Sequence, residues 1–456
     1  MSTPVAVSPP RITRAARPPG PPRRGLAGNL REFSADRLGS LDRWAREYGD
    51  LVSARFGPMP ILFANHPDLV EEVLVRQNRK FIKHYRLRQA KLTLGQGLLT
   101  SEGDFWRQQR KLAQPAFHRD RIAGYADLMV GFTDRLLAEW SDGQARDLQA
   151  DLMRLTLEIV TKALFGAELG GDAAEVREAM ETLMHSFLAT TSSPVIVPRW
   201  IPTPNNLRVK AAIRRLDRVL FRIITRRREE NQDRGDLLSM LLAARDDESG
   251  RGMTDRQLRD ECMTLFLAGH ETTASTLAWA WSLLAQHLEA EARLHEEVDA
   301  VLGERLPTLA DLPKLAFADH LITETLRLYP PGWMLGRESI APFELGGYRF
   351  GKGVTVFMTT YVIHRDPRWY DDPEAFRPER WADGLLQRIP RYAYFPFGGG
   401  PRICIGNNFA LMEATLVLAT IARKYRLSPA PGATVEVLPS MTLRPSHGMP
   451  MIVSQR

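Results

Sequence analysis

The chain has 456 residues, of which 44% are hydrophobic and 25% charged, a composition that is ordinary for a globular protein with a large core. Its two cysteines, Cys262 and Cys404, exclude a disulfide framework and a zinc site with a C-x-x-C pair, and they favour a reducing compartment. The net charge of +7 suits an anionic partner, but no nucleic-acid-binding motif accompanies it, so we expect no nucleic acid.

Residues 1–17 are predicted to form a disordered tail. This region lacks acids and contains arginines, as transit peptides do, but its prolines would break the amphipathic helix that such a peptide needs. It contains no apolar stretch long enough for a signal sequence or a membrane anchor, so we expect a soluble, cytoplasmic protein. Residues 18–456 show no repeat, linker or change of composition, and we expect them to form a single domain.

Hydrophobic periodicity predicts a mainly α fold with small β-sheets. In chain order, we expect strands at 51–56 and 61–64, helices at 150–165, 208–230, 255–287 and 319–329, strands at 343–350 and 354–358, and a helix at 409–425. The helix at 208–230 is rich in arginine. This charge indicates either a solvated helix face or a contact with an anionic surface or an acidic protein.

The segment at residues 395–406, Phe-Pro-Phe-Gly-Gly-Gly-Pro-Arg-Ile-Cys-Ile-Gly, carries the strongest functional signal in the chain. Its glycines and proline predict a tight loop, and the helix at 409–425 follows it. Cys404 therefore precedes a helix N-terminus, where free N–H groups and the helix dipole lower the pKa of a thiol and favour the thiolate. On these grounds alone Cys404 is open to three interpretations, as a metal ligand, a catalytic nucleophile or a small buried hydrophobe.

The positions Phe397, Gly400, Arg402, Cys404 and Gly406 match the pattern F-x-x-G-x-R-x-C-x-G. This segment resembles the haem-binding loop of the cytochrome P450 family. The resemblance implies that Cys404 is the iron ligand of a haem b group, and that the other four positions bind or shape the cofactor site.

A pair of charged residues, Glu324 and Arg327, lies on one face of the helix at 319–329, and Arg380 follows in a Phe-Arg-Pro-Glu-Arg-Trp segment. An isolated pair at this spacing usually lies on the surface and contributes little. Here the residues resemble the E-x-x-R motif of the same family and the arginine loop that follows it. The resemblance implies that the three side chains form a buried charge network behind the haem.

A polar segment at 268–273, Ala-Gly-His-Glu-Thr-Thr, interrupts the apolar helix predicted at 255–287. A glycine and polar side chains inside a helix indicate either a kink with satisfied polar groups or a local groove. The segment resembles the oxygen-activating motif of the family. The resemblance implies that Thr272 and Glu271 are catalytic, holding water and relaying protons to bound dioxygen, whereas His270 falls at a variable position and is not expected to be a ligand.

The carboxylates of haem propionates need cationic or N–H partners. Trp106 and Arg110 resemble the W-x-x-x-R motif of the family and are expected to be such partners, as is Arg402. Arg337 and Lys83 are weaker matches, and Lys83 is also open to interpretation as a solvated surface residue.

The family's topology implies which residues line the substrate pocket. We expect Ala268, Trp333 and Leu335 there, together with segments at 90–99 and 186–200 and the region near Met441. Most of these residues are apolar, so a lipophilic substrate is expected.

These features imply a monooxygenase that inserts one oxygen atom from O2 into a lipophilic terpenoid, fatty acid, steroid or polyketide, by hydroxylation or epoxidation. The chain ends soon after the helix at 409–425, and its Gly95-x-Gly97 lacks the third glycine of a dinucleotide loop. Electrons are therefore expected from a separate acidic ferredoxin or flavodoxin with its reductase. We expect the enzyme to be a monomer. A haem-thiolate peroxygenase or isomerase is one alternative, and a haem-based sensor or electron carrier is another.

Overall fold

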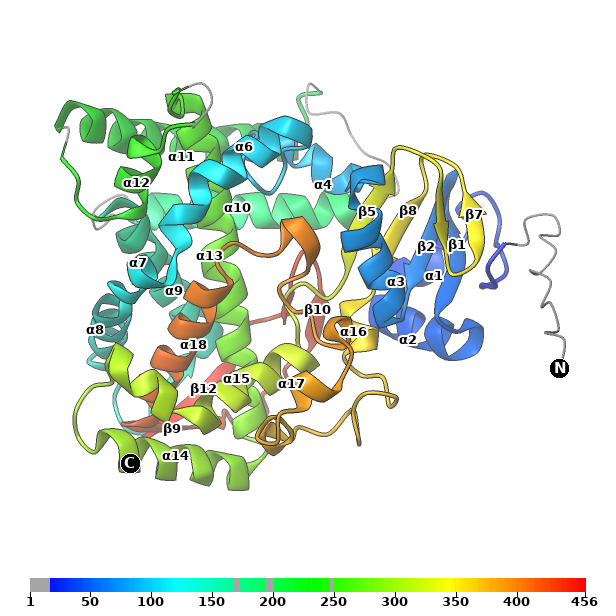
Figure 1. Ribbon diagram of the computed structural model, residues 1–456. Coiled ribbons are helices and arrows are strands. Elements are labelled where there is room, and N and C mark those ends of the chain that lie inside the picture. Colours follow the sequence, from blue (N-terminus) through cyan, green and yellow to red (C-terminus); the bar gives the residue numbers. More distant parts are fainter. Residues whose placement is uncertain (1–16, 167–172, 193–200, 231, 247–249) are drawn as a thin grey trace, which may run out of the picture.

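The structure, a computed structural model, describes residues 17–166, 173–192, 201–230, 232–246 and 250–456. Helices dominate it, and the larger sheet lies at one end of the molecule (Figure 1). The longer helices are α2 (Arg37–Tyr48), α6 (Gly103–Ala113), α8 (Ala126–Leu137), α9 (Leu148–Phe165), α10 (Ala173–Ser192), α11 (Pro204–Glu230), α13 (Asp255–Leu284), α14 (Leu288–Leu302), α15 (Ala316–Leu328) and α18 (Asn407–Ala422). The shorter helices are α1 (Leu30–Ala35), α3 (Pro67–Glu71), α4 (Tyr85–Gln89), α5 (Lys91–Leu94), α7 (Arg119–Ala123), α12 (Leu237–Ala243), α16 (Thr360–Ile363) and α17 (Leu385–Arg388).

The strands form one larger sheet and three small ones, so the expected mainly α fold with small β-sheets is confirmed. They are β1 (Leu51–Phe56), β2 (Met59–Ala64), β3 (Phe81–Lys83), β4 (Ala145–Asp147), β5 (Leu335–Ser339), β6 (Phe343–Leu345), β7 (Tyr348–Phe350), β8 (Thr355–Met358), β9 (Tyr425–Pro429), β10 (Val437–Pro439), β11 (Leu443–Pro445) and β12 (Pro450–Gln455). The segment expected as one strand at 343–350 is the hairpin β6–β7. Gly346 and Gly347 have φ angles of 56° and 81° and turn the chain there. The tail expected at 1–17 lies almost wholly outside the described residues.

The five-stranded sheet has the order β1-β2-β8-β5-β3. Strand β5 pairs antiparallel with β3, and this register places Lys83 directly opposite Arg337. Because alternate residues of a strand share one face, Leu335 and Arg337 point to the same side of the sheet. Both residues line the cavity described below.

Helix α13 runs through the middle of the molecule, between α9, α15 and α18 (Figure 1). It begins at a capping box, in which Thr254 and Gln257 each satisfy a backbone N–H of the other. A Cβ built on Gly269 would stand 2.9 Å from Cγ2 of Val160, so a glycine at this position lets α9 and α13 pack closely. Neither α13 nor any other helix in the described part of the chain is long and apolar enough to cross a membrane.

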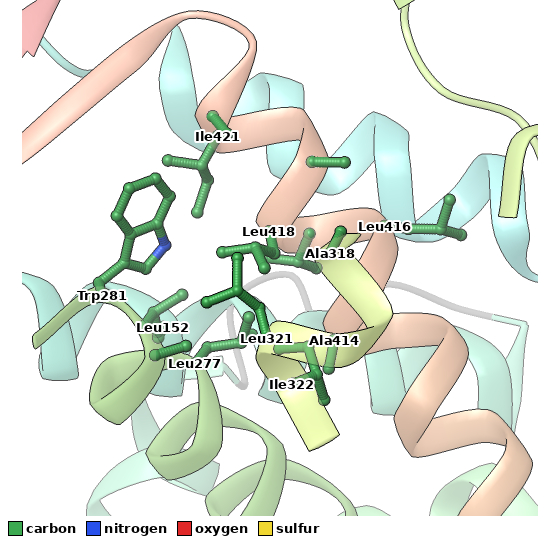
Figure 2. Packing of buried hydrophobic residues seen from close by; sticks show 14 of the residues in the cluster. Leu152, Leu277, Trp281, Ala318, Leu321, Ile322, Ala414, Leu416, Leu418 and Ile421 are labelled. Carbon is green, nitrogen blue, oxygen red and sulfur yellow. The ribbon is translucent and has the colours of Figure 1, made fainter. Parts of the chain in front are cut away.

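The main hydrophobic core lies where α13, α15 and α18 meet. Figure 2 shows the side chains that converge there, among them Leu277 and Trp281 of α13, Leu321 of α15 and Leu418 of α18. All four side chains are fully buried. This packing fixes the position of α13 relative to α18, and therefore relative to the Cys404 loop that precedes α18.

Replacing Leu321 by alanine is expected to lower the free energy of unfolding by about 2–5 kcal/mol, because the side chain is 0% exposed and its loss leaves a cavity. Leu386→Ala is the control, since Leu386 is 48% exposed and should change stability by no more than about 0.5 kcal/mol. Denaturant titration measures both variants. Equal losses from the two changes would contradict this view of the core.

Candidate active site

The loop that carries Cys404 is closed by its own backbone. The Cys404 N–H donates to the Phe397 carbonyl oxygen over 2.9 Å, and the Ile403 N–H donates to the Gly400 carbonyl oxygen over 3.1 Å. Gly400 has a φ of +63°, and a Cβ built there would stand 2.0 Å from the carbonyl oxygen of Leu74. Glycine is therefore required at position 400 both by its backbone conformation and by the neighbouring chain.

The side chain of Cys404 faces a cavity of about 360 Å³. Phe397 and Gly406 line it from the cysteine loop, while Ala268 and Thr272 line it from α13. The wall is mainly apolar and includes Leu99, Val160, Leu164, Leu265, Ile322, Leu326 and Leu335. The thiol thus shares one largely apolar cavity with the polar segment of α13.

The expectation that its position before a helix lowers the pKa of Cys404 is wrong for the thiol itself. The Gly406 N–H and the positive charge of Arg110 do act in that direction. Burial outweighs both effects and raises the pKa of Cys404 above its usual value. A metal ion bound to the sulfur would favour the thiolate, because coordination deprotonates it.

One edge of the cavity is cationic. The Arg402 guanidinium lies 4.0 Å from the centre of the Trp106 ring and forms an ion pair with Glu102. Burial, and secondarily the charge of Arg402, lowers the pKa of Arg337 to about 10. Within the described part of the chain Arg337 has no ion pair, and it donates only to the Gly336 carbonyl oxygen, over 3.0 Å.

A partly buried guanidinium without a carboxylate partner among the described residues suits an anionic group of a ligand. Haem fits this set of residues, with a thiol as iron ligand, apolar walls around the ring, and Arg337 and Arg402 at the edge where propionates would lie. Within the described residues, no cluster of histidine, cysteine and acidic side chains could hold a metal ion by itself.

Two residues expected as propionate partners, Arg110 and Lys83, donate to backbone carbonyl groups. Arg110 of α6 reaches the Ile403 carbonyl oxygen over 2.9 Å and braces the loop on the cysteine side. Lys83 donates to the carbonyl oxygens of Leu98 and Ser101 over 2.7 and 3.3 Å. The interpretation of Lys83 as a solvated surface residue is wrong, because it is only 5% exposed. An ammonium group has three donors, so one N–H of Lys83 remains for an anion.

The catalytic pair expected on α13 divides between two environments. The Thr272 hydroxyl lies at the cavity and donates to the Ala268 carbonyl oxygen over 2.8 Å. The Glu271 carboxylate is buried away from the cavity lining and accepts from the Thr442 hydroxyl over 2.6 Å. Burial raises the pKa of Glu271, while Thr442 and Arg444 oppose that effect.

The three residues of the expected charge network are brought together and buried. Arg327 donates to both oxygens of Glu324 at 2.8 Å, and Arg380 donates to one of them at 2.9 Å. Arg327 also donates to the His364 carbonyl oxygen over 2.9 Å. The His364 Nε2 atom in turn accepts from the Phe395 N–H over 2.9 Å. The network therefore connects with the segment that leads into the Cys404 loop.

The expected pocket residues fall in different places. Ala268 and Leu335 line the cavity, as does Leu99 at the end of the expected segment 90–99. Trp333 does not, because its indole N–H donates to the Ser440 carbonyl oxygen over 3.0 Å and its ring is buried elsewhere. Of the expected segment 186–200, residues 193–200 lie outside the described part of the chain.

Sequence reasoning did not identify Glu102, the ion-pair partner of Arg402. The Glu102 carboxylate also accepts from the backbone N–H of Lys83 over 2.8 Å, so it joins the loop before α6 to strand β3. An acid one helical turn before Trp106 was the only signal that could have pointed to it.

Comparisons with known proteins agree with this geometry. The family described as Cytochrome P450 matches residues 18–450. Cyclooctatin synthase of Streptomyces melanosporofaciens is 40% identical over 87% of this chain and 87% of its own length. Cyclooctat-9-en-7-ol 5-monooxygenase of the same organism is 39% identical over 85% of this chain and 84% of its own length. Pentalenene oxygenase of Streptomyces avermitilis is 37% identical over 85% of this chain and 86% of its own length. The chain belongs to the cytochrome P450 family of haem-thiolate monooxygenases.

Proposed function

We propose that the protein oxidises a cyclic terpenoid, by hydroxylation or epoxidation, with Cys404 as the ligand of a haem b iron. The apolar wall of the cavity beside Cys404 carries this proposal, because a hydrocarbon skeleton is held by surface contact and not by charge. The relatives named for cyclooctat-9-en-7-ol and pentalenene favour a terpenoid over the fatty acids, steroids and polyketides that the sequence also admits.

When bound, haem b supplies the iron chemistry that activates dioxygen. The residues of this chain bind and orient it. Cys404 would coordinate the iron, Arg337 and Arg402 would pair with the propionates, and the ammonium group of Lys83 would add a third contact. Arg110 and Gly400 act indirectly, since they hold the loop that presents the sulfur.

Thr272 is the proposed catalytic residue on the other side of the cavity. Its hydroxyl hydrogen is directed to the Ala268 carbonyl oxygen, so its lone pairs are free to accept from a water molecule in the cavity. Thr272 can therefore hold that water and move a proton toward the reacting oxygen. Glu271 lies behind it, and its carboxyl has to turn from Thr442 to take part in a proton path to solvent.

An acidic ferredoxin or flavodoxin is the proposed electron donor, docking on the Cys404 side. Helix α6 lies on that side, because its Arg110 contacts the Ile403 carbonyl oxygen. Exposed Lys111 follows on this helix and lines a surface hollow of about 540 Å³ together with His118, Asp120 and Arg121. The charges of Lys111 and Arg121 exceed that of Asp120 there and would attract an acidic carrier. The free cysteines suit the reducing cytoplasm, where we place the protein.

The first test concerns the iron ligand. The reduced protein with bound carbon monoxide is expected to show the Soret band characteristic of thiolate ligation, and Cys404→Ala should abolish it. Cys262→Ala should leave the band in place, because Cys262 is buried in α13 outside the cavity lining. Loss of the band from the Cys262 change alone would contradict the assignment.

The second test concerns the proton path. Thr272→Ala should bind haem and substrate normally, but the ratio of product to reductant consumed should fall about tenfold or more, with hydrogen peroxide released instead. Thr276→Ala is a matched control, because its hydroxyl makes the same kind of bond to the carbonyl four residues earlier, at 2.9 Å. Unchanged coupling in Thr272→Ala, or equal loss in both variants, would remove Thr272 from the mechanism.

The third test concerns the substrate and the reaction type. Spectral titration with cyclooctat-9-en-7-ol, pentalenene and lauric acid should show binding of a terpenoid and weaker binding of the fatty acid. Turnover under ¹⁸O2 with a ferredoxin and its reductase should place one labelled oxygen in the product. Oxidation of lauric acid alone would overturn the terpenoid proposal. Unlabelled product would indicate a peroxygenase or an isomerase.

A further inference from the structure

The loop between α5 and α6 is held along its backbone by three consecutive residues of α13. Each of these side chains bonds to one backbone group, and together they reach every second residue from Leu94 to Leu98. Arg259 Nη1 donates to the Leu94 carbonyl oxygen at 3.1 Å, the Gln96 N–H donates to Asp260 Oδ2 at 2.7 Å, and the Leu98 N–H donates to Glu261 Oε2 at 3.0 Å. The N-terminal part of α13 therefore holds the backbone of this loop in one conformation.

The glycines of Gly95-x-Gly97, which do not form a dinucleotide loop, make this contact possible. A Cβ built on Gly97 would stand 2.5 Å from the Asp260 carbonyl oxygen and 2.2 Å from the Thr264 hydroxyl oxygen. Gly95 has a φ of +78°, and its Cβ would stand 2.0 Å from Oδ1 of Asp260. Any larger residue at these two positions would push the loop away from α13.

Lys83 holds the same loop from the opposite side. Its ammonium group donates to the Leu98 carbonyl oxygen over 2.7 Å, while Glu261 accepts from the Leu98 N–H. Both backbone groups of Leu98 are therefore held by buried polar side chains.

The residue that follows Leu98 in the chain is part of the cavity wall. Leu99 lines the cavity together with Leu265, Ala268 and Thr272 of α13. Glu261 stands one helical turn before Leu265, so the helix that carries Thr272 also fixes the backbone next to Leu99. The position of Leu99 relative to Thr272 is thus set within one rigid unit.

We infer that Glu261 is a positioning residue, which sets the place of Leu99 in the cavity wall and so selects which molecules reach the Cys404 side. This selection also determines which carbon of the substrate is oxidised, and that part of the inference rests on the proposed terpenoid function. Glu261 acts through Leu98 and Leu99 and touches no reacting atom itself.

An acid at this buried position has a desolvation cost, and what it supplies in return is an acceptor for the Leu98 N–H. Glu261 is only 1% exposed, and its Oε1 atom has no hydrogen-bond partner among the described residues. Burial raises the pKa of Glu261 to about 7, although the Leu98 N–H and the charge of Lys83 oppose this effect. A leucine of similar volume would fill the space without that desolvation cost. What the leucine would lack is the acceptor for the Leu98 N–H.

The experiment compares Glu261→Leu with Glu261→Gln, which keeps an oxygen acceptor for the Leu98 N–H. The ferric haem protein is titrated spectrally with imidazole and with 4-phenylimidazole, whose phenyl ring has to fit against the wall that contains Leu99. Glu261→Leu should change the ratio of the two dissociation constants by about tenfold. Glu261→Gln should stay within about twofold of the wild type.

Two further measurements separate positioning from general damage. Hydrogen exchange of the peptide spanning residues 96–101 should become faster in Glu261→Leu and stay slow in Glu261→Gln. In a Leu99→Ala background, Glu261→Leu should leave the ratio of the two dissociation constants unchanged. The Leu99 side chain is absent there, so a shift of its backbone no longer alters the cavity wall. Cys262→Ala is the matched control, being adjacent on α13 and equally buried at 1% exposed.

Three results would overturn the inference: an equal shift in Cys262→Ala, an equal shift in Glu261→Gln, or additive effects in the Leu99→Ala background. Should Glu261→Leu fail to fold, Glu261→Asp replaces it, since it keeps the charge but is too short to reach the Leu98 N–H. An unchanged ratio in Glu261→Asp would also overturn the inference. The titration needs no substrate, so its outcome is independent of whether a terpenoid is oxidised.

Discussion

The closed loop from Phe397 to Cys404 is the constraint on which the site depends. The backbone bond between these two residues and the close approach of Gly400 to the Leu74 carbonyl oxygen hold the loop in place. The Cys404 side chain lines the cavity that Thr272 also lines. Packing of α13 against α18 then fixes the position of the hydroxyl relative to the thiol. The chemistry we propose requires both groups to share one largely apolar cavity.

Buried charge supports this loop at two levels. Behind it, Glu324 and Arg327 pair at 2.8 Å, and backbone carbonyl groups satisfy the remaining donors of the guanidinium, so the desolvation cost of both charges is offset. His364 links this network to the start of the loop, because its carbonyl oxygen accepts from Arg327 and its Nε2 atom accepts from the Phe395 N–H. In front, Arg337 keeps a desolvated charge without a carboxylate partner in the described structure, which is the arrangement that an anionic cofactor completes. A satisfied network thus fixes the shape of the site, and Arg337 is left for the contact with a propionate that we propose.

The sequence predicted most of the fold and the loop, because periodicity and glycine positions are local properties. Features that depend on distant partners were predicted less well. Glu271 was expected to serve the cavity, but it bonds to Thr442, and Trp333 was expected in the wall, but it bonds to the Ser440 carbonyl oxygen. Both partners lie more than a hundred residues away, and periodicity does not reveal them. The direction of the Cys404 pKa was missed for a related reason, since the helix terminus is local whereas burial is a property of the whole fold.

X-ray absorption at the iron edge of the haem-loaded ferric protein tests the central claim most directly, because it identifies the atoms bonded to the metal without relying on a spectral signature. The account predicts one sulfur neighbour of the iron in the wild-type protein, and its loss when Cys404 alone is replaced by serine. A wild-type iron surrounded only by nitrogen and oxygen, or a sulfur neighbour that persists in Cys404→Ser, would contradict it.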